Sequence, residues 1–142
     1  MTDAPRSPWI RAVTLFRAVS VLFLLDTLFQ AALAGLFVTG DVEFLAWHAA
    51  NAQLLSALVV VEALAAAAVW RALRGPLWPL LGAVGLLGLL SAQQGLGAAR
   101  MLGGHLPLGM AIFGLGAALT YWAFTFRPGR PGPRKPAWED GR

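Results

Sequence analysis

The sequence contains no cysteine. This absence excludes disulfide bonds, iron–sulfur clusters, zinc sites built on thiolates and cysteine nucleophiles. Charged residues are also scarce, since they make up 13 % of the 142 residues, whereas a soluble domain usually has about 25 %. Hydrophobic residues account for 58 % of the chain. These proportions exclude a soluble globular domain and predict an integral membrane protein.

Four apolar stretches follow one another along the chain, each near the ~20 residues that a helix needs to cross a ~30 Å hydrocarbon core. They cover residues 18–38, 44–70, 77–99 and 105–126. Because the connecting segments are short, consecutive helices are expected to be antiparallel. We therefore predict an all-α membrane domain, residues 1–126, that forms an up-down-up-down four-helix bundle. Residues 127–142 are basic and rich in proline, and are expected to form an extended tail.

The distribution of positive charge predicts the orientation of this bundle. Ten of the eleven Lys and Arg residues fall before the first stretch, between the second and third, or in the tail. Arg100 alone lies on the other side. By the positive-inside rule, the chain is a multi-pass protein of the cell membrane with both termini in the cytoplasm. The net charge of +4 is thus a topology signal with a mild attraction to anionic lipid, and nucleic acid is not an expected partner.

The two predicted hairpins carry a similar polar pattern. In the first, Gln30 lies about two turns below the outer surface and His48 opens the next helix. In the second, Gln93 and His105 take the corresponding places. The only two histidines of the chain are therefore expected at similar depth, at the same end of the second and fourth helices.

These histidines predict a haem site between the two hairpins. Gly109 and Gly116 share the helix face of His105 and leave space beneath it. Two imidazoles above a cleft of glycine and aliphatic side chains could each supply one axial ligand to a b-type haem. Arg100, the single basic residue at that end, is expected to pair with a haem propionate.

Other interpretations of the same residues remain open. Rows of glycine in membrane helices often serve only close helix packing, and a membrane histidine often serves as a hydrogen-bonding residue between helices. Zinc is a minor alternative, since two histidines with the nearby acids Asp41 and Glu43 make a poor ligand set.

A family resemblance agrees with the haem interpretation. Residues 94–109, with the sequence QGLGAARMLGGHLPLG, resemble the region between the third and fourth helices in one half of a heme A synthase. Residues 13–126 as a whole resemble one four-helix half of that family, or a related small four-helix haem-binding membrane protein. The resemblance implies that His48 and His105 are the axial pair.

The same resemblance argues against the enzymatic activity of that family. A glutamate precedes the first-hairpin histidine of the family by three residues and an arginine follows it, whereas this chain has Leu45 and Ala49 there. The resemblance therefore implies a haem protein, with a heme A synthase-like oxidase activity in doubt, and we predict no catalytic residue.

Two acidic residues, Asp26 and Glu62, interrupt the apolar stretches. Counting 1.5 Å per residue from Arg17 and Trp70 places both at comparable depth. An unpaired carboxylate in a membrane is costly, so the two are expected to be protonated, to share a proton, or to form a proton or quinone site. The alternative is a neutral carboxylic acid that ties the first two helices together.

The sequence thus predicts a bis-histidine membrane protein that transfers electrons, with the lipid bilayer and a quinone or redox protein as partners. A six-coordinate iron lacks an open position, which favours electron transfer over oxygen chemistry. Two alternatives come from other classes of protein. One is a cofactor-free accessory or anchoring subunit of a larger membrane complex. The other is a small proton-coupled transporter, assembled as a homo-oligomer, that uses Asp26 or Glu62.

Overall fold

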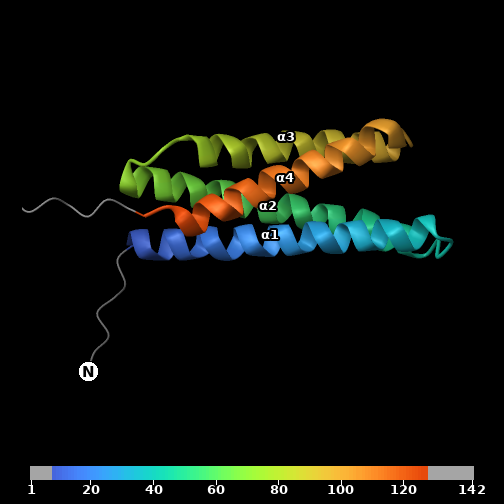
Figure 1. Ribbon diagram of the computed structural model, residues 1–142, viewed down its shortest axis with the longest axis horizontal. Helices are drawn as coiled ribbons and strands as arrows, with labels where there is room; N and C mark the ends of the chain where they lie inside the picture. Colours follow the sequence, from blue (N-terminus) through green and yellow to red (C-terminus); the bar gives the residue numbers. More distant parts are fainter. Residues whose placement is uncertain (1–7, 128–142) are drawn as a thin grey trace, which may run out of the picture.

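The computed structural model describes residues 8–127, which form helices joined by short loops, without a strand in this range. Its four helices are α1 (Pro8–Val38), α2 (Phe44–Leu73), α3 (Trp78–Ala98) and α4 (Leu102–Thr125) (Figure 1). Each is long and apolar enough to cross a membrane. The all-α prediction is confirmed for these residues, and the helices indicate a multi-pass membrane protein. The predicted tail falls outside the described residues, apart from Arg127.

The helix bounds differ from the predicted ones mainly at the beginning of α1. This helix starts at Pro8, whereas the apolar stretch starts at Ala18. Proline is favoured in the first turn of a helix, where its missing N–H group costs no hydrogen bond. Hydropathy marks only the part of a helix that lies in lipid, so it missed the first turns, which contain Arg11 and Arg17. In the same way α4 begins at Leu102, before the predicted start at His105.

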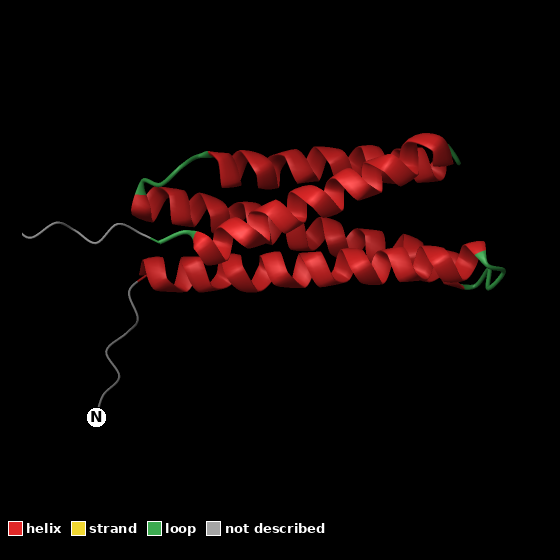
Figure 2. Cartoon of the chain, viewed as in Figure 1, coloured by secondary structure: helices red, strands yellow, loops and turns green. Residues whose placement is uncertain are grey.

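The four helices form a ring in which each contacts two neighbours. Helix α1 packs on α2 and α4, and α3 packs on the same two helices. The loops that follow α1 and α3 lie at one end of the molecule, and the loop between α2 and α3 lies at the other (Figures 1 and 2). In this ring order, α2 and α4 lie diagonally opposite each other, and their backbones are not in direct contact.

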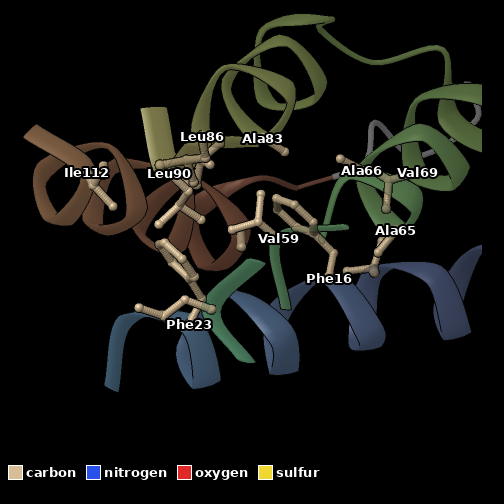
Figure 3. Close-up of a cluster of buried hydrophobic side chains, with 14 residues drawn as sticks. Phe16, Phe23, Val59, Ala65, Ala66, Val69, Ala83, Leu86, Leu90 and Ile112 are labelled. Carbon is tan, nitrogen blue, oxygen red and sulfur yellow. The ribbon is translucent and has the colours of Figure 1, made fainter. Parts of the chain in front are cut away.

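The interior is packed with apolar side chains from all four helices. Phe16 and Phe23 of α1 point towards Val59 of α2 and Leu86 of α3 (Figure 3). These four side chains are at most 1 % exposed. Large apolar side chains also cover the outside of the bundle, for example Leu25 of α1 with 58 % exposure. An apolar exterior around an apolar core is what lipid surroundings require.

Candidate functional site

The structure brings the two histidines together at one end of the bundle. His48 lies in the first turns of α2 and His105 in the first turn of α4. Their ring centroids are 6.2 Å apart, and the ring planes are inclined by 54°. Both side chains are half-buried. Because α2 and α4 are diagonal helices, the rings meet across the middle of the bundle.

A backbone carbonyl of the preceding helix holds each imidazole ring. His48 Nδ1 lies 3.2 Å from the carbonyl oxygen of Gln30 in α1, and His105 Nδ1 lies 2.9 Å from that of Gln93 in α3. Since a carbonyl oxygen only accepts hydrogen bonds, each Nδ1 carries the ring proton, and each Nε2 keeps a free lone pair. Metal-binding histidines are usually held in this way.

The side chains of the two glutamines show where the hairpins differ. Gln30 is fully engaged: its Nε2 donates to the carbonyl of His48 at 3.0 Å, and its Oε1 accepts from Asn51 Nδ2 at 2.9 Å. In the second hairpin the position three residues after the histidine is Leu108, whose side chain has no N–H group to donate. Accordingly Gln93 Oε1 is buried without a hydrogen-bond partner in the described residues.

Replacing Leu108 with asparagine is expected to satisfy Gln93 and to stabilise the second hairpin. The new amide would take the place that Asn51 has in the first hairpin, and a buried acceptor without a partner costs about 1–3 kcal/mol. Leu108 also packs against the core, so Leu108→Ala is the matched control for the lost contact. Thermal unfolding of the two variants in detergent is the measurement. We expect Leu108→Asn to be more stable than Leu108→Ala by about 1 kcal/mol; equal stabilities would contradict the proposed pairing.

Glycines bring neighbouring groups close to the histidines. A Cβ atom at Gly97 of α3 would lie 3.1 Å from His105 Cε1, and one at Gly109 would lie 3.0 Å from Gln93 Nε2. Gly97 thus lets the His105 ring lie against α3, a role that the sequence analysis missed. The space beside Gly109 is filled by the amide of Gln93.

Gly116 lies away from the site that its helix face suggested. It is about 16 Å along α4 from His105, at a rise of 1.5 Å per residue. A Cβ atom at this position would lie 2.7 Å from Cε1 of Phe23 in α1. Gly116 therefore serves the packing of α1 on α4, and we leave it out of the candidate site.

The charged residues of the two loops at the histidine end of the bundle lie at the surface. Arg100 is exposed in the loop between α3 and α4, where its φ angle of 57° is left-handed. Asp41 and Glu43 are exposed in the loop after α1. Between residues 8 and 127, no three His, Asp or Glu side chains lie together in a way that could hold a metal ion. The zinc alternative therefore lacks a ligand set in this part of the chain.

Glu62 of α2 is tied to α1 within the core. It is fully buried, and its Oε1 accepts a hydrogen bond of 2.7 Å from Ser20 Oγ in α1. This hydrogen bond agrees with the expected tie between the first two helices. Separately, the Thr120 hydroxyl of α4 lies 2.9 Å from the Gly116 carbonyl of its own helix and 3.1 Å from the Ser20 carbonyl of α1. Glu62 Oε2 has no hydrogen-bond partner in the described residues.

Asp26 and Glu62 lie at different depths. Glu62 is level with Ser20 through their hydrogen bond, and Ser20 lies about 9 Å along α1 from Asp26. The expectation of equal depth is not met, because α1 begins at Pro8 and Arg17 therefore lies within the helix instead of at its end. A proton shared directly between the two carboxyl groups does not fit this separation.

In comparisons with known proteins, the chain matches no family model, no curated protein and no solved structure. The resemblance of residues 94–109 to the heme A synthase family therefore stays a prediction from the sequence.

Proposed function

We propose that this chain is a membrane haem protein in which His48 and His105 are the axial ligands of one b-type haem, and that it transfers electrons. The observation that carries the proposal is the pair of neighbouring imidazoles, each anchored through Nδ1 and each without a hydrogen bond at Nε2 among the described residues. If two imidazole rings bind one metal from opposite sides, each through Nε2 at about 2 Å, their ring centres are about 6 Å apart. The observed separation is 6.2 Å.

The donor set fits an iron that exchanges electrons. His48 and His105 would hold the iron through two neutral nitrogen atoms, a ligand set that favours electron transfer over oxygen chemistry. When bound, the haem supplies a one-electron couple, and a membrane quinone or a redox protein is the class of partner that such a centre serves. The chain lacks the family glutamate, since Leu45 stands in its place, and we propose no oxidase activity.

The residues around the histidines would hold the rings and the porphyrin in place. The carbonyl groups of Gln30 and Gln93 fix the ring orientations and make each Nε2 a stronger donor to iron. Gly109 lies one turn along α4 from His105, and the Gln93 amide packs against it, so this amide would have to move aside for a porphyrin edge. Arg100, exposed in the outer loop, would pair with a propionate.

The proposed topology is up-down-up-down, with both termini in the cytoplasm. It is supported by the concentration of basic residues before α1, between α2 and α3, and after α4. It places the histidines at the outer end of the bundle. A reporter enzyme fused after Arg142 measures the side of the C-terminus, and activity confined to the outer face would refute this orientation.

An absorption spectrum of the purified chain in detergent, with haem added, tests the function. We expect one haem per chain, with a sharp Soret band and the visible bands of six-coordinate low-spin iron in both redox states. A chain that shows no Soret band after haem addition is not a haem protein. That result would leave the cofactor-free membrane subunit as the better interpretation.

A further inference from the structure

A shallow cavity that is partly open to the surroundings lies at the opposite end of the bundle from the histidines. Its volume is about 450 Å³, and the described residues that line it are Trp70, Arg71 and Arg74. Sites for small ligands usually measure about 300–1,000 Å³. Its lining residues belong to the last turn of α2 and its C-cap, at the end of the bundle where the chain crosses from α2 to α3 (Figure 1).

The lining residues suit a phosphate group at the edge of a bilayer. Each guanidinium group stays charged and offers several N–H donors, which match the oxygens of a phosphate in a bidentate way. Tryptophan is enriched at the level of the headgroups, where its ring lies between lipid and water, and Trp70 is 40 % exposed. Clusters of basic residues next to a membrane helix attract anionic headgroups, and all three residues belong to the end of α2.

The depth of the cavity agrees with this chemistry. Helix α2 has 30 residues, so it is about 45 Å long and exceeds the ~30 Å hydrocarbon core. The helix therefore extends beyond the core at one end or both. Arg71 in its last turn favours this end as one that lies among the headgroups, so the cavity is expected near the level of lipid phosphates.

We propose that this cavity binds the phosphate-bearing headgroup of an anionic phospholipid between Arg71 and Arg74, with the Trp70 ring beside it. This inference is independent of the haem, since the two sites lie at opposite ends of the molecule.

The backbone of Arg74 provides a variant that removes the charge without straining the fold. Its φ angle is 47°, in the left-handed region. Glycine is the usual residue where a helix ends in this conformation, because it has no Cβ atom to clash. Arg74→Gly therefore deletes the guanidinium group and suits the local backbone. Arg100 is a matched control, since its φ angle of 57° is also left-handed and Arg100→Gly makes the same change in charge at the other end.

Native mass spectrometry of the haem-free chain in detergent, with phosphatidylglycerol or phosphatidylcholine added, counts the lipids that stay bound. We expect preferential retention of phosphatidylglycerol. Arg74→Gly should weaken it about fivefold, the effect of one basic residue near an anionic surface, whereas Arg100→Gly should leave it unchanged. Circular dichroism verifies that both variants keep their helices.

Other outcomes overturn the proposal. An equal loss in both variants would show that only net charge attracts the lipid, and no loss in Arg74→Gly would show that the cavity does not hold the headgroup. Inorganic phosphate serves as a separate probe. If it binds with the same dependence on Arg74 and phosphatidylglycerol binds no more tightly, the ligand is a soluble anion instead of a lipid.

Discussion

Replacing His105 with alanine is expected to abolish the six-coordinate haem spectrum while the four helices remain. The ring of His105 is one of two proposed axial ligands. Its Nδ1 is held by the Gln93 carbonyl, and alanine has neither this contact nor a nitrogen atom that could bind iron. The helices persist, because within a bilayer each satisfies its own backbone hydrogen bonds. His48→Ala should have the same effect. Absorption spectra of the haem-loaded variants, with circular dichroism for helix content, are the measurements.

Two methionines near His105 provide the control for this result. Met101 and Met110 are 58 % and 76 % exposed, so their sulfur atoms face the surroundings of the bundle. We expect Met101→Leu and Met110→Leu to leave the spectrum unchanged. If the double variant without His48 and His105 keeps a six-coordinate low-spin spectrum, the assignment of the ligands is wrong.

Gly116→Ala is expected to destabilise the bundle by about 1–3 kcal/mol, the usual cost of one extra carbon atom in a packed core. The new Cβ atom would lie 2.7 Å from Cε1 of Phe23 and 3.0 Å from its Cδ1. The ring of Phe23 has no exposed surface, so it has no free space into which it could turn. The loss should appear as a lower midpoint of thermal unfolding in detergent.

A glycine two residues away gives the matched control for this prediction. A Cβ atom at Gly114 of α4 would meet nothing within 4 Å. There the higher helix propensity of alanine should act alone and stabilise the helix by about 0.5–1 kcal/mol. Combining Gly116→Ala with Phe23→Leu should remove the clash, so the losses of the two single variants should not add. Equal midpoints for Gly116→Ala and Gly114→Ala would contradict this account of the packing.

The sequence predicted the number of helices and most of their bounds well, because hydropathy and helix length depend on the same lipid core. It failed where a helix continues beyond lipid. The beginning of α1 at Pro8 was missed, and this error carried over to the depth of Asp26. Relative depth depends on which residues of two helices meet, such as Ser20 and Glu62, and a pattern along one chain does not contain that information.

The same limit applies to the candidate site. The repeat placed His48 and His105 at equivalent positions, and the structure brings them together. The groups that hold them were not predicted, because they are backbone carbonyls, which every residue has. The unsatisfied amide oxygen of Gln93 could have been suspected from the sequence, since the repeat pairs Asn51 with Leu108.

The unequal helix lengths determine how the bundle responds to membrane thickness. Helix α3, with 21 residues, is about 31 Å long and therefore matches an average hydrocarbon core of about 30 Å with almost no excess. In a thicker membrane its ends would be drawn into hydrocarbon, whereas α1 and α2 could adapt by standing more upright. Hydrophobic mismatch would thus act first on α3. Because the His105 ring is held by a carbonyl of α3, the geometry of the histidine pair would be sensitive to the thickness of the bilayer.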